Sequence, residues 1–180
     1  ENIKILGLFL HSRKIKIGKL YANKFRIKIR NCDPEKGIET FKTLQKTGVP
    51  NVFGWQRFGK NRDNHKIGKE IIKKVSKVKI HDKGKLWLYV SAYQSFLYNQ
   101  ILNERLKLGI KKFEGDLMKH YYGLESPSAL FPGQKTPLAG GIQGEIEKRV
   151  LEENAVAPEE IPSRGKRRAI LFPLLESNYK

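Results

Sequence analysis

The order of hydrophobic and polar residues predicts two short strands near the N-terminus. Residues 3–10 are mostly apolar, and residues 25–30 alternate between apolar and basic side chains. In a strand, this alternation would bury three apolar side chains and place three basic side chains together on the outer face. The buried set would be Phe25, Ile27 and Ile29, and the exposed set Arg26, Lys28 and Arg30.

Helices are predicted over much of the remaining chain. Asp33 as N-cap and Pro34 at the first helical position open a helix that we expect to end at Gly48. Ser91 and Gln94 form a capping-box pattern, which predicts a helix over residues 91–107. Apolar residues at helical spacing predict two more helices, near residues 67–78 and around residues 146–151. Residues 111–141 contain many glycines and prolines, which predict loops and short strands.

The charge of the chain is strongly uneven. The 180 residues contain 36 Lys and Arg against 18 Asp and Glu, a net charge of +18, and residues 1–90 hold 23 of the basic and 7 of the acidic side chains. This excess indicates a surface that faces a polyanion, although a solvated cationic surface without a specific partner is also compatible with it. Nucleic acid suits a basic strand better than an anionic membrane does. The candidate phosphate contacts in this region are Arg13, Lys14, Lys16, Lys19, Arg26, Lys28 and Arg30.

Several classes of protein are disfavoured by composition. The single cysteine, Cys32, excludes an internal disulfide and argues against a structural zinc site. No apolar run approaches the ~18–20 residues that span a bilayer, and the four histidines lie far apart in the sequence. We therefore expect a cytoplasmic, monomeric protein that uses no metal and binds no membrane.

The segment from Gly48 to Gly59, Gly-Val-Pro-Asn-Val-Phe-Gly-Trp-Gln-Arg-Phe-Gly, is the most unusual in the chain. A loop this rich in glycine can bend tightly, which lets side chains approach a ligand. Its aromatic residues could stack on bases, its amides could bond base edges, and its arginine could hold a phosphate or carboxylate. These residues are Phe53, Trp55, Phe58, Asn51, Gln56 and Arg57. From composition alone, a loop that caps the core, with its arginine in a buried ion pair, is equally compatible.

This segment resembles the signature of the TruD family of tRNA pseudouridine synthases, commonly G-x-P-N-Y-F-G-x-Q-R-F-G. Residues 11–30 are similar to the family's stretch of a His, a basic run, Gly-x-Leu and Gly-Asn-x-Phe. Residues 91–99 resemble its Ser-Ala-x-x-Ser-x-Leu-Phe-Asn helix, and residues 114–116 and 165–168 have weaker counterparts. Val52 and Ala22 depart from the pattern, where the family usually has Tyr and Gly.

The resemblance implies a cofactor-free isomerisation of uridine to pseudouridine in tRNA. The target base is flipped out of the stack, and an aspartate attacks so that the glycosidic bond can break. By motif match, Phe53 would stack on the flipped base, and Asn51 would either fix the loop or hold the aspartate. The family's Gly-x-Lys-Asp motif, which carries this nucleophile, does not occur in these residues, and neither does its Pro-x-Gly-Ser-Tyr-Ala-like segment. We therefore expect residues 1–180 to be part of a longer enzyme and inactive alone.

The fold implied by the resemblance is α+β. It combines part of a catalytic domain, with a mixed and largely antiparallel sheet, and a mostly helical α+β insertion domain. Residues 1–76 would belong to the catalytic domain, residues 77–170 to the insertion, and residues 171–180 to the return. RNA would lie between the two domains, with Arg167 and Arg168 on the wall opposite the basic strand. A non-catalytic basic RNA-binding module is the alternative.

Overall fold

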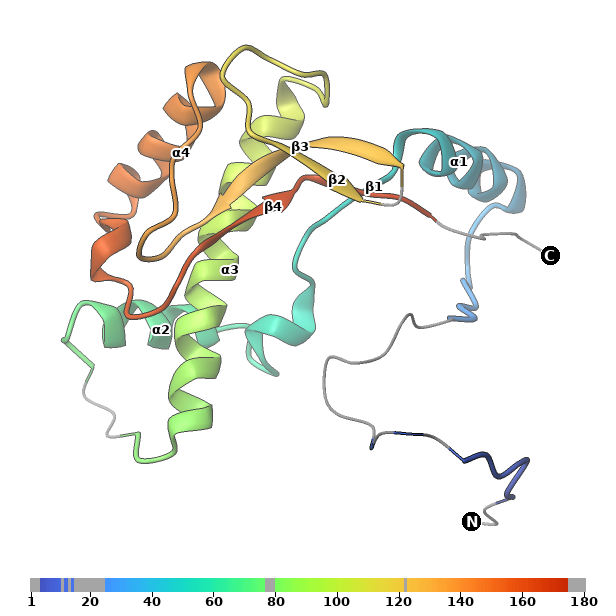
Figure 1. Cartoon of the computed structure of the whole chain (residues 1–180), viewed down its shortest axis with the longest axis horizontal. Coiled ribbons are helices and arrows are strands. Elements are labelled where there is room, and N and C mark those ends of the chain that lie inside the picture. The colour runs from blue at the N-terminus through green and yellow to red at the C-terminus, as the bar shows by residue number, and fades with distance from the viewer. Residues whose placement is uncertain are drawn as a thin grey trace.

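The structure is a computed structural model, and it describes residues 4–10, 12, 14, 25–76, 80–121 and 123–174. The chain forms an α+β fold with antiparallel sheets, which confirms the predicted fold class (Figure 1). Its elements are α1 (Pro34–Thr47), β1 (Val49–Pro50), η1 (Trp55–Phe58), α2 (Asn64–Ile72), α3 (Lys83–Lys107), β2 (Met118–Tyr121), β3 (Leu124–Phe131), α4 (Gly141–Glu153), η2 (Pro158–Glu160), β4 (Lys166–Ala169) and β5 (Leu171–Phe172).

The strands form two small antiparallel ladders. Strands β2, β3 and β4 lie in that order, with Met118 opposite Pro127 and Ser128 opposite Ala169. Strand β1 pairs with β5, which is separated from β4 by one residue, Ile170. The C-terminal part of the described chain therefore connects the three-stranded sheet to the segment that precedes η1.

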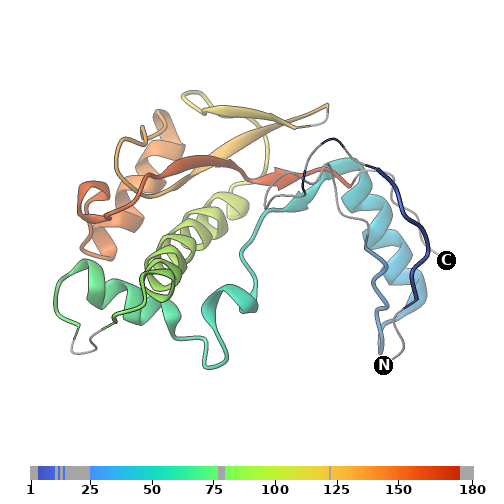
Figure 2. The same ribbon diagram turned by 60° about the horizontal axis from the view of Figure 1, so that its bottom comes forward.

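Helix α3 lies at the centre of the fold, between the sheet on one side and α2 on the other (Figure 2). Its apolar side chains join those of β3 and α4 in one core. Side chains that are fully buried in this way stabilise a fold by about 1.5–3 kcal/mol each. The most deeply buried members include Leu97, Tyr98, Ile101, Leu102, Ala129, Leu130 and Ile170.

Helices α2 and α3 approach each other closely at Gly68. A Cβ atom at this position would lie 2.1 Å from the carbonyl oxygen of Tyr89, so only glycine fits. This contact holds α2 against α3 and fixes the position of the segment before it. No described helix is long and apolar enough to cross a bilayer.

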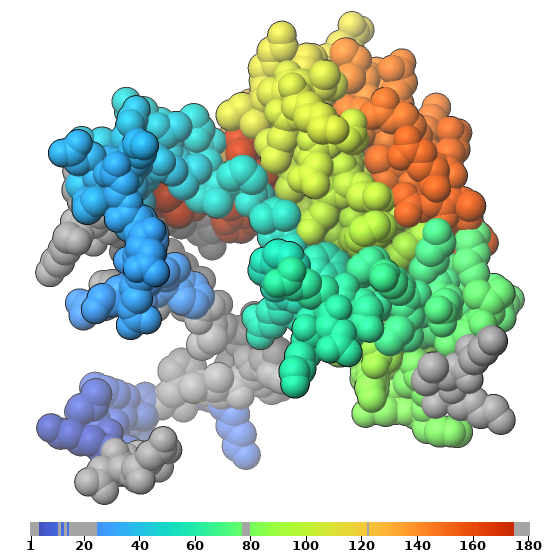
Figure 3. Space-filling view, turned by 180° about the vertical axis from the view of Figure 1, so that it is seen from behind, coloured from blue at the N-terminus to red at the C-terminus, as the bar shows by residue number. Residues whose placement is uncertain are grey.

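Helix α1 confirms the helix predicted from its caps. The Asp33 side chain accepts hydrogen bonds from the backbone N–H groups of Glu35 and Lys36, at 3.0 and 3.3 Å, and Gly48 ends the helix with a φ of 82°. None of its residues is buried, and the helix stands to one side of the main body (Figure 3). Its boundaries therefore follow from local signals alone.

The two predicted N-terminal strands are wrong. Residues 4–10 and 25–30 form no strand, and residue 3 lies outside the described part of the chain. The side chains predicted to be buried are exposed instead: Phe25 by 77%, Ile27 by 79% and Ile29 by 72%. An alternating pattern becomes a strand only when another strand pairs with it, and no described segment pairs with residues 25–30. The three basic residues are exposed but do not form one face of a strand.

Two helix boundaries also differ from the prediction. Helix α3 begins at Lys83 rather than Ser91, because Asp82 caps it by accepting bonds from the N–H groups of Gly84 and Lys85 at 2.7 and 3.1 Å. The earlier cap draws the apolar run 86–90 into the helix. Helix α2 ends at Ile72, before Val75, which is exposed.

Candidate active site around Phe53

The loop after β1 places Phe53 in contact with α3, β3 and β4. The Phe53 ring meets Tyr98 of α3 edge-on, with ring centroids 5.6 Å apart, and packs at a tilt against Phe131 of β3 at 5.8 Å. The side chain is only partly buried. Its ring is therefore held by the core while part of it remains accessible.

Asn99 of α3 holds the backbone of Phe53 in place. The Phe53 N–H donates to Asn99 Oδ1 at 3.0 Å, and Asn99 Nδ2 donates to the Phe53 carbonyl oxygen at 2.9 Å. One side-chain amide thus satisfies both polar groups of this residue. Sequence reasoning did not select Asn99 as a site residue, although it is the last residue of the 91–99 segment that matched the family pattern.

Asn51 attaches the same loop to the end of β4 and to Ile170, the residue that follows β4. Its backbone N–H donates to the Ile170 carbonyl oxygen at 2.9 Å, and its Nδ2 donates to the Ala169 carbonyl oxygen at 2.9 Å. Its Oδ1 accepts a bond from Arg168 Nη2 at 2.8 Å. These bonds favour the first of its two expected roles, that of fixing the loop.

Two arginines lie over the Phe53 ring. The guanidinium carbon of Arg168 is 4.3 Å from the ring centroid, and that of Arg57 is 5.2 Å away. Arg57 has one weak side-chain bond, in which Nη1 donates to Ser91 Oγ at 3.4 Å. Neither arginine forms an ion pair with a carboxylate of the described residues, and Arg168 Nε is buried without a partner among them. Two uncompensated positive charges therefore flank the ring, an arrangement that favours an anion.

The Tyr98 side chain packs against Phe53 and is itself held by a hydrogen bond. Its hydroxyl donates to the Ala169 carbonyl oxygen at 3.1 Å. Burial raises the pKa of Tyr98 to about 12, against the opposing effect of Arg168. The phenol is therefore protonated at neutral pH and acts as a fixed donor.

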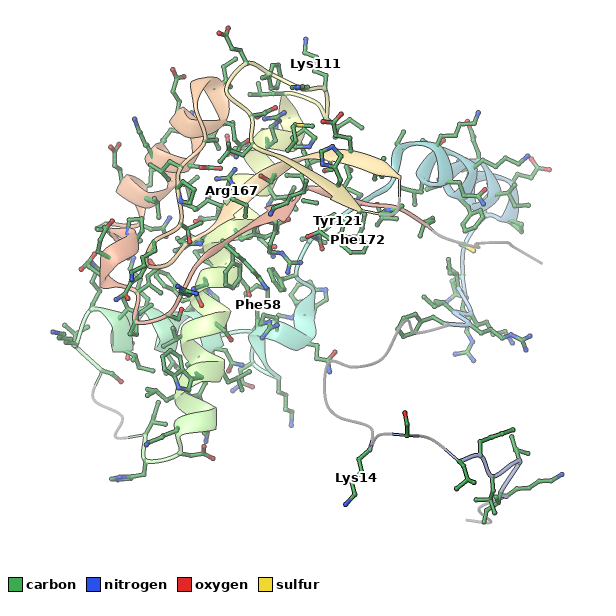
Figure 4. All side chains as sticks on the ribbon, viewed as in Figure 1. Lys14, Phe58, Lys111, Tyr121, Arg167 and Phe172 are labelled. Carbon is green, nitrogen blue, oxygen red and sulfur yellow. The ribbon has the colours of Figure 1, made fainter. Side chains whose placement is uncertain are left out.

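The remaining predicted RNA contacts are not all gathered at this site. Gln56, on η1, is exposed, and so are Arg26, Lys28 and Arg30, while Lys14 lies well away from the sheet (Figure 4). Arg13, Lys16 and Lys19 lie outside the described residues. Whether these side chains contact RNA stays a prediction.

Arg167 points to the opposite face of β4 from Arg168, the residue that lies over Phe53, because successive side chains of a strand alternate. Its side chain is 7% exposed, and its Nη1 bonds Glu147 Oε2 at 2.7 Å, with further bonds to Ser128 (Figure 4). Its guanidinium is therefore occupied inside the protein, and only the adjacent Arg168 reaches the Phe53 ring. A phosphate contact by Arg167 stays a prediction.

No hydrogen bond or ion pair joins any of the chain's four aspartates, all of which lie in the described part of the chain, to Phe53, Arg57 or Arg168. Asp33 and Asp82 cap helices, Asp63 precedes α2, and Asp116 pairs with the buried Arg105 at 2.7 Å. Among the described residues, no cluster of three or more His, Cys, Asp and Glu side chains could hold a metal ion.

Comparisons with known proteins agree with this geometry. The family model for tRNA pseudouridine synthase D (TruD) matches residues 1–82, which include the whole Phe53 loop. A tRNA pseudouridine synthase D from Nitratiruptor sp. is 32% identical over 95% of this chain and 60% of its own length. The corresponding protein of Sulfurimonas denitrificans is 32% identical over 100% of this chain and 63% of its own length. The chain thus spans about 60% of the length of these relatives.

The fold has a counterpart among solved structures. A Methanosarcina mazei protein, described as a candidate tRNA pseudouridine synthase D, matches with a TM-score of 0.61 and 23% identity, over 81% of this chain and 58% of that one. The likeness shows that the two proteins share one α+β fold. The family model over residues 1–82 and the curated relatives over nearly the whole chain show that the protein is similar to the TruD family of tRNA pseudouridine synthases.

Proposed function

We propose that this protein converts a uridine in tRNA to pseudouridine without a cofactor. Similarity to the TruD family supports this reaction over a non-catalytic RNA-binding role, because the curated relatives carry the name tRNA pseudouridine synthase D. The observation that carries the proposal is the Phe53 ring beneath two arginines that have no carboxylate partner in the described chain. This site has a stacking surface for a base and positive charge for an anion.

Phe53 is the residue that we assign to stack on the flipped uridine. A flipped base needs a surface that replaces its lost stacking, and an aromatic ring supplies about 1–3 kcal/mol per base. The ring can do this without being reoriented, since Asn99 and Tyr98 already hold it.

The base would displace Arg57 rather than Arg168 from the ring. A cation over an aromatic ring contributes about 0.5–1 kcal/mol at an exposed site, less than a stacked base does. Arg168 is additionally held by Asn51 at 2.8 Å, whereas Arg57 has only its 3.4 Å contact with Ser91. The freed Arg57 can then bind a phosphate next to the uridine.

Arg168 is the group that we assign to the nucleophilic aspartate, which the family resemblance puts outside residues 1–180. A carboxylate nucleophile must stay ionised, and a neighbouring guanidinium lowers its pKa. The unpartnered Arg168 Nε offers a donor for this purpose.

The tRNA would lie across the junction of two domains. We propose that residues 1–76 and 171–180 belong to the catalytic domain and residues 77–170 to an insertion. The pairing of β1 with β5 and the end of the family match at residue 82 support these boundaries. The Phe53 loop, from the first part, contacts α3, β3 and β4 of the second, so the site lies where the two parts meet.

Replacement of Phe53 by alanine in the full-length protein tests the assignment. Pseudouridine formation, scored by carbodiimide labelling of tRNA, should fall at least tenfold, while tRNA affinity should change less than threefold. Phe172→Ala, which removes an exposed ring from β5, is the matched control and should change neither. Equal loss of activity and binding would instead support a loop that only caps the core, and pseudouridine formation by residues 1–180 alone would contradict the external nucleophile.

A further inference from the structure

A second pocket opens on the α2 side of α3, away from the Phe53 ring. Its volume is about 420 Å³, and it is lined by residues of α2 and α3, by Lys73 and Val75, and by Asn154 after α4. This volume lies in the range typical of small-ligand sites. The proposed isomerisation does not use this pocket.

Aromatic rings form one wall of the pocket. The His65 ring stacks on Phe96, with centroids 4.4 Å apart and planes 17° apart. The Tyr93 ring is nearly parallel to Phe96, with planes 15° apart and centroids 6.3 Å apart. Such surfaces suit a planar ligand.

Two polar groups of these rings have no partner among the described residues. The Tyr93 hydroxyl and His65 Nδ1 are both buried and unbonded, and Tyr93 as a whole is 1% exposed. Buried polar groups of this kind cost about 1–3 kcal/mol each unless something satisfies them. A ligand in the pocket is the natural source of such bonds.

The protonation of these groups favours a ligand that both accepts and donates. Burial, together with nearby Glu160, raises the pKa of Tyr93 to about 12, so its hydroxyl is a donor at neutral pH. Burial and Lys66 lower the pKa of His65, despite the opposing effect of Asp63, so the ring is neutral and has one acceptor nitrogen. The edge of a nucleobase carries acceptors and donors side by side.

The pocket also has free positive charge at its rim. Lys73 is paired with Glu160 at 2.8 Å, but Lys66 and Lys69 form no ion pair with a described carboxylate. Glu70 also lines the pocket, and Lys66 and Lys69 together leave an excess of positive charge, which suits a phosphate of a nucleotide.

We propose that this pocket binds an unpaired nucleotide of the RNA close to the modified uridine, an inference that rests on the proposed function. Tyr93 and Phe96 precede Asn99 by six and three residues of α3, a separation of about 4.5–9 Å along the helix axis. Phe58 of the signature loop also meets the His65 ring edge-on at 5.6 Å. The two sites therefore share one helix and one loop, and one RNA strand can occupy both.

Binding of tRNA and of a single-stranded fragment, measured by fluorescence anisotropy against salt, tests this pocket. Tyr93→Phe removes only the hydroxyl and should raise Kd about fivefold, the order of one lost hydrogen bond. Lys66→Ala with Lys69→Ala should lower the slope of log K against log salt by about 1.4, or ~0.7 per lost phosphate contact. Tyr121→Phe and Lys148→Ala, which change the same residue types outside the pocket, should leave Kd and slope unchanged.

Cross-linking locates the nucleotide directly. RNA that carries 4-thiouridine beside the target position should cross-link to the peptide containing Tyr93 and Phe96, and the lysine double variant should lose this product. Wild-type Kd and slope in all pocket variants, without such a cross-link, would overturn the proposal. The proposed function can fail separately. If the wild-type protein forms no pseudouridine but the pocket variants still lose RNA binding, the pocket is supported and the proposed function is contradicted.

Discussion

Arg167 and Arg168 are neighbours on β4, yet they belong to opposite environments. Arg167 is directed away from Phe53 and is enclosed, with Glu147 and Ser128 as partners. Arg168 lies over the Phe53 ring and meets Asn51, with no carboxylate partner in the described chain. Successive side chains of a strand point to opposite faces, so Arg167 stabilises the fold while Arg168 is placed to act on a ligand.

The enclosed side is a satisfied network. Glu147 is fully buried and accepts bonds from Leu130 N–H, Gln143 and Ala139 N–H as well as from Arg167. The Phe53 side keeps an unpaired donor instead, on Arg168. Buried charge is therefore paired on the Arg167 side, where it stabilises the fold, and unpaired on the Arg168 side, where we propose that a ligand binds.

The largest effect is expected from Arg167→Met. The variant leaves the buried Glu147 carboxylate unpaired, which should lower the free energy of unfolding by about 3–5 kcal/mol. Urea unfolding measures the change, and Lys166→Met, at the exposed neighbour on β4, should shift it by no more than ~0.5 kcal/mol. The double variant Arg167→Met with Glu147→Gln should recover part of the loss, because it removes the unpaired charge and keeps a side-chain oxygen as acceptor for the buried donors around it. An unfolding free energy unaffected by Arg167→Met would remove the distinction between the two arginines.

The same network should make stability depend on acid through Asp116. Burial alone would raise the pKa of Asp116, but hydrogen bonds from Arg105 and the Phe113 N–H outweigh it and lower the pKa below 3.8. The stabilisation is therefore present above pH 3.8 and is lost as the pH falls through the lowered value. Urea unfolding between pH 2 and pH 7 should show this acid loss in the wild type and a smaller one in Asp116→Asn, which is less stable at neutral pH. Parallel pH profiles would contradict the assignment.

Arg168→Met should separate activity from stability. Loss of one hydrogen bond and one cation–ring contact should cost only about 1–2 kcal/mol of unfolding free energy. Pseudouridine formation should fall at least tenfold, and Arg168→Lys should not restore it, since lysine lacks the planar fork. A stability loss as large as that of Arg167→Met would show that the two arginines do not differ in role, and full activity in Arg168→Lys would contradict the need for a planar guanidinium.

The smallest effect is expected from Lys28→Ala. Lys28 is exposed on a segment without regular structure, so its removal should leave stability unchanged. It should weaken binding similarly for different RNA sequences and reduce the salt slope by ~1 or less. Anisotropy titrations measure both, and a loss of activity at saturating tRNA would place Lys28 in the site rather than on a general basic surface.

Local signals predicted some elements of the fold well, and others depended on distant contacts. Helix α1 was predicted because Asp33, Pro34 and Gly48 act within a few residues. The prediction of a strand at residues 25–30 was wrong because a strand needs a pairing partner, and an alternating sequence pattern does not specify that partner. The start of α3 was misplaced because Ser91 forms a capping pattern but donates to the Leu88 carbonyl oxygen inside the helix.

The motif predicted which loop forms the site, but it did not predict the role of each residue. The signature loop singled out Phe53 and Asn51, and the structure brings Arg57 and Arg168 onto the same ring. The different surroundings of Arg167 and Arg168 could not be predicted, because the face of β4 that each one occupies depends on its register with β3. Asn99 was missed as a site residue because its contact with Phe53 spans 46 positions.

The pairing of β1 with β5 has an evolutionary consequence. Val49 lies opposite Phe172 and Pro50 opposite Leu171, so residues 51–170 leave and return at one place on the fold. The entropy of closing a flexible loop grows only logarithmically, and doubling its length costs about 0.6 kcal/mol. Surface loops within this segment can therefore lengthen or shrink with little entropic penalty, provided that the core between the two strands is kept.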